Sequence, residues 1–202
     1  MSRLPPIPYS EWDLDALADA APGMKPPPVN VIGLFAHHPE LAKSFLAYNR
    51  HLTGRASTVD RRTRELVILR VAWRRRCRYE WAQHTLIAKR AGVTDEEIAR
   101  LRDGVAAPGS GTAASGTVQL LISAVDELLD DSGLSDETYE ALAAELDARQ
   151  LMDLVFTIGT YAPLAMAFNS FGVELDPGVS ADDFDAFYPA RYPARPQPQK
   201  ET

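Results

Sequence analysis

Apolar residues recur every three or four positions along most of the chain, which is the period of an α-helix. In PELAKSFLAYNRHL the residues Leu41, Phe45, Tyr48 and Leu52 are four, three and four apart, and Pro39 stands where a first-turn proline is favoured. The next segment, RRTRELVILRVAW, is apolar on nearly all sides and predicts a buried helix. These patterns predict two successive helices of different burial.

Further helices are predicted by their start and stop signals. One runs from about Cys77 to Ala91, and a short one follows Thr94, which forms a capping box with Glu97. The pattern of TVQLLISAVDELLDD predicts another, and the last extends from about Arg149 to Phe171 before Gly172. Small, turn-rich residues at 106–116 predict a linker. With no strand pairs or repeats in view, the expected class is all-α.

Proline sets the two ends of the chain apart. Seven prolines fall within residues 1–30, and YPARYPARPQPQK closes the chain. Proline fixes φ and lacks an amide donor, so extended arms are expected, with a short helix possible in SEWDLDALADA. Aromatic residues in both arms suggest that they pack on their own domain or on a neighbour. The expected organisation is an arm at 1–30, a helical domain at 31–178 and a second arm at 179–202.

The last predicted helix, within LMDLVFTIGTYAPLAMAFNSFG, is more apolar than one small domain needs. It is either the central core helix or a subunit interface, and the second choice predicts a homo-oligomer. Charges are expected to interrupt every apolar run before 18 residues, so no membrane span is expected. No secretory signal is evident and the one cysteine excludes an intrachain disulfide, which together favour a cytoplasmic location.

Net charge narrows the range of partners. The formal charge of −7 argues against binding to a nucleic acid backbone, since the only dense basic run, Arg74–Arg78, is small. Four histidines without clustered spacing give no support for a metal site, and no cofactor is expected.

The candidate chemistry lies in RRRCRYEWAQH, residues 74–84. Glu80 and His84 are four apart on a helix, so the carboxylate is expected to orient the imidazole as a general acid or base. Cys77 lies near the helix N-terminus and beside arginines, which would lower its pKa, unless it is a small buried hydrophobe. Arg74 and Arg76 either form a solvated corner or bind a substrate carboxylate, so the expected substrate is a small anion.

The segments RRTRELVILRVAW, CRYEWAQH, AGVTDEEI and FNSFGVELD together resemble the carboxymuconolactone decarboxylase superfamily, which includes alkylhydroperoxidase D. The resemblance implies a helical bundle of the alkylhydroperoxidase D type, a trimeric or hexameric assembly and no cofactor. It matches Glu65 to the glutamate of the family motif, Cys77 to its first cysteine and His84 to its histidine. The second, peroxidatic cysteine falls on Glu80.

Three functions follow from the resemblance. The first is a cofactor-independent lyase of the decarboxylase type, using Glu65, Glu80 and His84 for acid–base catalysis on a small carboxylated, lactone or carbonyl compound. The second is a peroxiredoxin-like redox enzyme that relies on Cys77 alone, which the missing second cysteine disfavours. The third is a non-catalytic oligomeric binding protein, which three retained ionisable groups disfavour.

Overall fold

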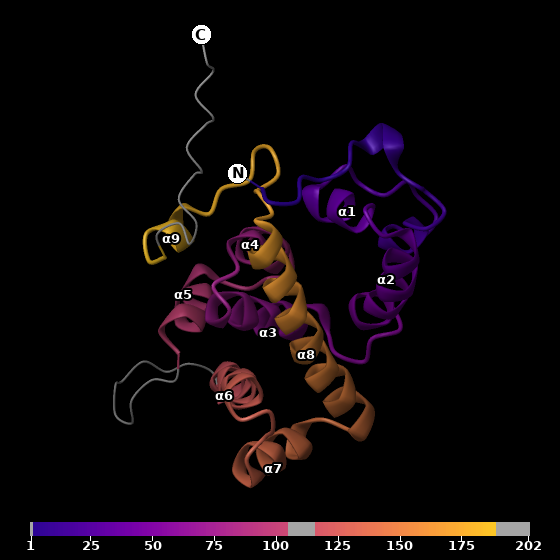
Figure 1. Cartoon of the computed structure of the whole chain (residues 1–202). Coiled ribbons are helices and arrows are strands. Elements are labelled where there is room, and N and C mark those ends of the chain that lie inside the picture. Colours follow the sequence, from indigo (N-terminus) through magenta and orange to yellow (C-terminus); the bar gives the residue numbers. More distant parts are fainter. Residues whose placement is uncertain (1, 105–115, 189–202) are drawn as a thin grey trace.

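The computed structural model describes residues 2–104 and 116–188, and in these residues helices are the only regular elements. Two short 3-10 turns, η1 and η2, precede the helices α1 to α9 (Figure 1). Their bounds are η1 Tyr9–Glu11, η2 Ala18–Ala20, α1 Asn30–Phe35, α2 Pro39–Thr53, α3 Arg61–Arg74, α4 Arg78–Arg90, α5 Asp95–Asp103, α6 Gly116–Asp130, α7 Asp136–Glu145, α8 Ala148–Phe171 and α9 Asp182–Asp185. The all-α class is confirmed.

Side-chain caps fix where the helices begin. Asp60 caps α3 by accepting from the amides of Arg62 and Thr63. The predicted capping box of Thr94 and Glu97 is confirmed at the start of α5. At the other end of the chain, Gly172 ends α8 in the left-handed conformation, with φ of 67° and ψ of 48°.

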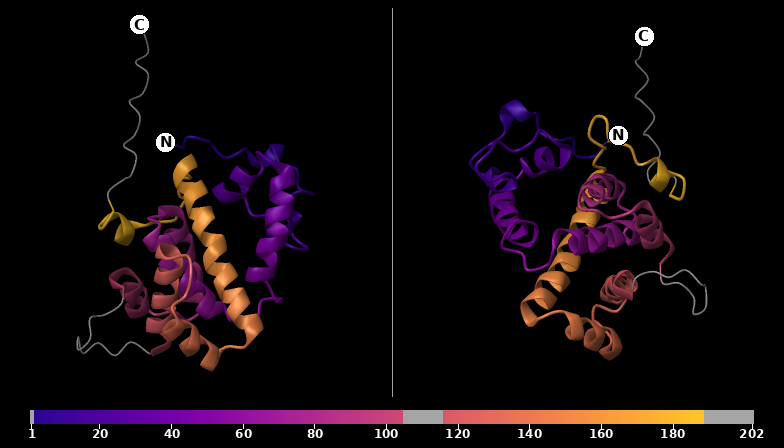
Figure 2. Two further views of the ribbon diagram at one scale, coloured as in Figure 1. Left: turned by 60° about the horizontal axis from the view of Figure 1, so that its bottom comes forward. Right: turned by 180° about the vertical axis from the view of Figure 1, so that it is seen from behind.

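Helix α3 is the centre of the molecule, as its apolar sequence predicts. Every residue from Arg64 to Trp73 is buried, because α3 packs against α4, α5, α6 and α8. In the views of Figures 1 and 2, α8 crosses the molecule with α1 and α2 on one side and α5, α6 and α7 on the other. Side chains in the middle of α3 therefore have little access to water.

Helix α2 is confirmed, but the face it buries differs from the predicted one. Leu41 and Tyr48 are 53% and 40% exposed, whereas Ala42, Leu46 and Leu52 are buried. The N-terminal arm supplies the reason, because it covers α2 from the side opposite α8. The helical period therefore predicts the helix, but the packing of the N-terminal arm determines which side of that helix is buried.

The N-terminal arm packs on the chain's own helices. Leu17 is 1% exposed and shares a small apolar cluster with Ile32, Ala42 and Leu46. The backbone amide of Ile7 donates to Gly33 at 2.9 Å. In place of the possible helix in SEWDLDALADA, the arm has only the turns η1 and η2.

The C-terminal arm is described as far as residue 188. Phe184 of α9 is 3% exposed and packs against the rings of Trp73 and Trp81. The predicted linker falls almost wholly within 105–115, and the proline-rich end within 189–202, both outside the described residues.

The apolar stretch of helix α8 is longer than expected from the sequence. Across its 24 residues it is long and apolar enough to cross a membrane, whereas charges were expected to break every such run. Half of its most apolar 18-residue window is buried inside the protein. On its outer side Met152, Phe156 and Met166 are 51% to 60% exposed.

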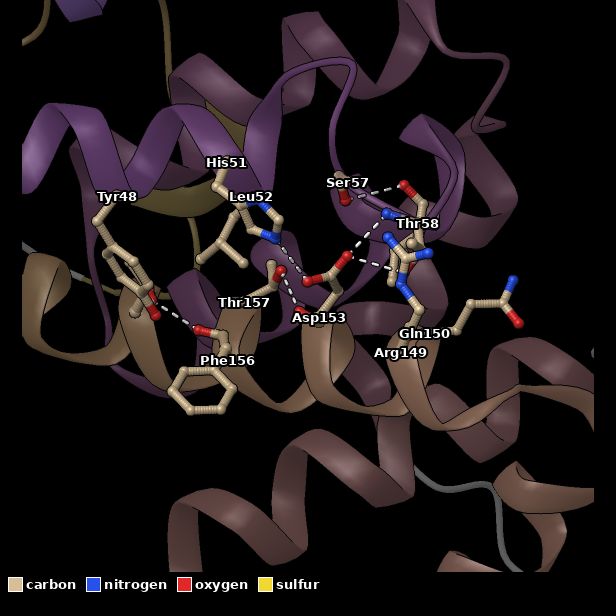
Figure 3. Close-up of polar contacts among 12 residues, drawn as sticks. Tyr48, His51, Leu52, Ser57, Thr58, Arg149, Gln150, Asp153, Phe156 and Thr157 are labelled. Carbon is tan, nitrogen blue, oxygen red and sulfur yellow. Dashed lines mark hydrogen bonds and ion pairs between the residues drawn. The ribbon is translucent and has the colours of Figure 1, made fainter.

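The start of α8 is fastened to α2 and to the loop before α3 by one carboxylate. Figure 3 shows Asp153 pointing toward His51 and Thr58. Asp153 Oδ2 accepts from the amide and the hydroxyl of Thr58, both at 2.7 Å, and its Oδ1 lies 3.0 Å from His51 Nε2. The loop so held leads directly into α3, which carries Glu65.

Candidate active site

Glu65 and His84 form a buried pair between α3 and α4. Glu65 Oε2 lies 2.7 Å from His84 Nδ1, and the two side chains are 4% and 14% exposed. Arg64 Nε lies 3.9 Å from the other oxygen of Glu65. A carboxylate accepts the Nδ1 proton, so the neutral imidazole keeps its lone pair on Nε2.

Glu80 does not orient His84, contrary to the expectation from their spacing. Both oxygens of Glu80 are buried without a hydrogen-bond partner, and the residue is 2% exposed. Burial raises the pKa of Glu80 well above its usual value, and the nearby Cys77 thiol offsets this only in part. Helical neighbours are within reach of each other, but Glu65 on the facing helix takes the Nδ1 position instead.

A pocket of about 220 Å³ opens beside this pair, between α1, α2, α4 and α8. Most of its wall is aliphatic or aromatic: Val29, Val31, Ile32, Phe35, Phe45, Leu46, Ile87, Leu164 and Phe168. The polar residues of the wall are Asn49, Tyr79, Glu80, Gln83, His84 and Tyr161. The site therefore combines apolar enclosure with a few hydrogen-bonding groups, as is common for small-molecule sites.

Asp176, in the loop after α8, holds two polar residues of the wall in place. Its Oδ2 accepts from the Tyr79 hydroxyl at 2.8 Å and from Gln83 Nε2 at 2.5 Å, while its Oδ1 accepts from the amide of Asn30 at 2.7 Å. Burial, followed by this carboxylate, raises the pKa of Tyr79 above its usual value. Tyr79 is consequently a fixed, neutral phenol at this wall.

Tyr161 packs edge-on against the imidazole of His84, with 5.1 Å between ring centroids. Burial raises the pKa of its phenol, and the carboxyls of Glu65 and Glu80 act in the same direction. The ring limits the movement of His84 and keeps water from that side of the imidazole.

Cys77 is a buried residue and not an activated thiol. It is the N-cap residue of α4 with 0% exposure, and it is not part of the pocket wall. Burial raises the pKa of its thiol well above the usual value, and Glu80 contributes in the same direction. The effects of the helix end and the arginines, which were expected to dominate, are outweighed because the thiol is fully desolvated.

The arginines of the 74–78 run are engaged away from the pocket. Arg74 binds the carboxylates of Asp126 and Asp130, both at 2.7 Å. The guanidinium carbon of Arg76 lies 5.1 Å from the ring centroid of Tyr188. The structure thus does not bring Arg74 and Arg76 to Glu65 and His84, because carboxylates and a ring distant in sequence hold them elsewhere.

His37 and His38 make contacts that hold the fold together. His38 caps α2 by accepting from the amide of Leu41, and His37 Nε2 lies 2.7 Å from the Pro5 carbonyl. Over residues 2–104 and 116–188, no three His, Cys, Asp or Glu side chains are grouped so that they could hold a metal ion.

Residues 39–122 match the model of the carboxymuconolactone decarboxylase family. The chain also superposes on the core of an alkylhydroperoxidase AhpD-type, peroxidase-related protein from Ralstonia eutropha, with a TM-score of 0.68, 17% identity and coverage of 91% of this chain and 94% of that one. The middle of the chain is thus similar to the carboxymuconolactone decarboxylase family. Its fold is the alkylhydroperoxidase D-like bundle.

Two further solved structures share this fold. A peroxidase-related protein from a Silicibacter species gives a TM-score of 0.63 at 14% identity, with 82% of each chain covered. An Agrobacterium tumefaciens protein of unknown function, described as an AhpD-type antioxidant defence protein, gives 0.59 at 18% identity over 70% of this chain and 94% of that one. No curated protein matches the chain in sequence. Identities this low establish the fold alone.

Four residues of this site had no role predicted from the sequence: Arg64, Tyr79, Tyr161 and Asp176. Arg64, Tyr79 and Asp176 stand inside the segments that carry the family resemblance, but the resemblance assigned them no role. Tyr161 gave no signal, because an aromatic residue in an apolar helix looks like any core residue.

Proposed function

We propose that the protein is a cofactor-independent acid–base enzyme of the carboxymuconolactone decarboxylase type, acting on a small carbonyl or lactone compound. The observation that carries this proposal is the pair of Glu65 and His84, 2.7 Å apart at a largely apolar pocket. A carboxylate on Nδ1 fixes the imidazole tautomer and stabilises the imidazolium that forms when Nε2 takes a proton.

The chemical step assigned to His84 is proton transfer at a carbon next to a carbonyl. In the base direction Nε2 takes the proton, and the electron pair of the C–H bond moves onto the carbonyl oxygen as an enolate. In a decarboxylation His84 must begin as the imidazolium: the C–C bond breaks, carbon dioxide leaves, and Nε2 gives its proton to the carbon that keeps the electrons. Glu65 stays an acceptor throughout and holds the imidazole in position.

A redox enzyme of the alkylhydroperoxidase type is the second candidate, and the peroxidase-related descriptions of two structural neighbours favour it. The burial of Cys77 stands against it, because a peroxide must reach a thiolate. A non-catalytic binding protein is the third candidate, and the buried pair of Glu65 and His84 stands against that.

Turnover measurements on the full chain test the proposal. Small ketones, lactones and carboxylated lactones are supplied in deuterated buffer, and exchange at the carbon next to the carbonyl and loss of carbon dioxide are followed by NMR. His84→Ala should lower kcat by about 10²-fold or more, the usual contribution of a general acid or base. Cys77→Ala is the matched control and should stay within a few-fold of the wild type.

Peroxide consumption that depends on Cys77 would replace this proposal with the redox function. If the wild type turns over neither panel, the binding role becomes the better account. Glu65→Gln tests whether Glu65 orients His84 or only stabilises the fold. A lower kcat with an unchanged melting temperature supports the orienting role.

A homo-oligomer is also part of the proposal, of trimeric or hexameric size by resemblance to the family. Phe156 on the outer side of α8 is 51% exposed, between Met152 and Met166. Phe156→Glu should reduce the mass measured by light scattering, whereas Tyr139→Glu, at a ring 53% exposed on α7, should not. A cytoplasmic location fits a lone, buried thiol.

A further inference from the structure

Glu80 is the group in this site that the proton transfer does not use. Its side chain belongs to the pocket wall, its exposure is 2%, and neither oxygen has a hydrogen-bond partner. An unpaired buried polar group costs roughly 1 to 3 kcal/mol when estimated from protein mutants. A carboxyl group left in this state is therefore available to a ligand that occupies the pocket.

The pocket wall beside Glu80 carries no fixed positive charge. Across the described part of the chain, no lysine or arginine lines the pocket. Arg64 Nε lies 3.9 Å from Glu65, and Glu65 also faces His84 Nδ1, so both of these groups are directed at Glu65 and not at Glu80. Without a cation the neutral carboxyl is the stable form, which agrees with the upward shift of the Glu80 pKa.

A neutral carboxyl carries one O–H donor, and that donor decides which ligand fits. A ketone or lactone oxygen can accept this proton and satisfies the group without bringing charge into the site. A carboxylate would have to leave water for an apolar pocket that contains no arginine, close to Glu65. The pocket wall thus favours an uncharged acceptor and opposes an anion.

We propose that Glu80 is a specificity-determining residue whose protonated carboxyl donates a hydrogen bond to a carbonyl oxygen of an uncharged substrate, and that the pocket rejects carboxylates. The inference rests on the proposed function, because it names the substrate class of the same site. It also reverses the charge preference expected from the arginine run and narrows the substrates to neutral ketones and lactones. Of the two reactions proposed for His84, it therefore keeps the proton transfer next to a carbonyl and excludes the decarboxylation.

Binding measurements with two small probes test it without requiring turnover. Acetophenone and benzoate share the phenyl ring and the same number of non-hydrogen atoms, but at pH 7 only benzoate is charged. Their Kd values are measured by NMR titration of the full chain. Acetophenone should bind at least about ten-fold more tightly, the equivalent of one hydrogen bond gained or one anion desolvated.

Two variants of Glu80 identify the hydrogen bond. Glu80→Leu removes the donor at similar size and should weaken acetophenone binding about five- to ten-fold. Glu80→Gln keeps an N–H donor and should stay within about three-fold, given the modest net value of one neutral hydrogen bond. In the infrared spectrum at pH 7, the wild type should show a protonated-carboxyl stretch that both variants lack.

Equal affinity for benzoate and acetophenone, no binding of acetophenone, or undiminished binding by Glu80→Leu would each overturn the inference. So would the absence of the protonated-carboxyl band. The His84→Ala variant separates the two proposals: it should still bind acetophenone although it has lost turnover. Discrimination by charge without any turnover would leave the inference standing and refute the proposed function.

Discussion

Replacing Asp153 with alanine should destabilise the junction that places α3. The change removes two hydrogen bonds from Thr58 at 2.7 Å and the contact of 3.0 Å with His51. Hydrogen bonds to a charged group contribute about 1.5 to 3 kcal/mol each, but those here are partly buried and not additive. The His51 side chain is 51% exposed, so solvent screening reduces its contribution to roughly 0 to 1 kcal/mol. The expected loss is about 2 to 4 kcal/mol of unfolding free energy.

The pH dependence of that loss has a definite sign. Burial would raise the pKa of Asp153, but the hydrogen bonds from Thr58 and His51 outweigh it and lower the pKa. A carboxyl with a lowered pKa stabilises the fold above its unfolded pKa of about 3.9, and this contribution disappears as the pH falls through the folded value. The difference between wild type and Asp153→Ala should therefore be full at pH 7 and shrink below about pH 4.

Urea denaturation at pH 7 and at pH 3 measures this difference. Glu140→Ala is the control, because Glu140 is an exposed carboxylate on α7 and should change stability by less than about 0.5 kcal/mol. A loss below about 0.5 kcal/mol for Asp153→Ala at pH 7 would refute the reasoning from hydrogen bonds. An equal loss at both pH values would refute the reasoning from charge.

Three further predictions concern buried groups. Cys77 should react with iodoacetamide at least about 100-fold more slowly in the folded protein than in urea, since alkylation must wait for opening of the structure. Glu80→Leu should raise the unfolding free energy by about 1 to 3 kcal/mol, because it removes an unpaired buried carboxyl. The gain should be larger at pH 7 than at pH 4. A carboxyl with a raised pKa destabilises the fold as the pH rises above its unfolded pKa of about 4.3. Arg70→Met should cost about 2 to 4 kcal/mol in urea denaturation, because it leaves Asp126 with Arg74 alone.

The order of helices could be predicted from the sequence because it depends on local signals. The capping box at Thr94 and the glycine that ends α8 are short-range features that the structure repeats. The buried face of α2 could not be predicted so well, since it depends on where the N-terminal arm packs. Leu41 follows the helical period and is nonetheless 53% exposed.

In the candidate site, too, contacts between residues close in sequence and contacts between distant residues differ in how well they could be predicted. His84 and Glu65 could be paired only through the family resemblance, because the two residues stand on different helices. Helical spacing alone suggested Glu80 as the partner of His84, and the structure gives that place to Glu65. The carboxylates that bind Arg74 lie more than 50 residues further along the chain, so the sequence near the arginines gave no sign of these ion pairs.

The two carboxyls near His84 differ because their neighbours differ. Glu65 faces the imidazole and lies 3.9 Å from the guanidinium of Arg64, so it can remain a hydrogen-bond acceptor in an enclosed site. Glu80 faces the pocket with no such neighbour, and its neutral form is a donor. Enzymes commonly obtain an acid and a base from similar side chains by separating their environments in this way. Adding a cation beside Glu80 would therefore remove its proposed role, since an ionised Glu80 could no longer donate to a carbonyl.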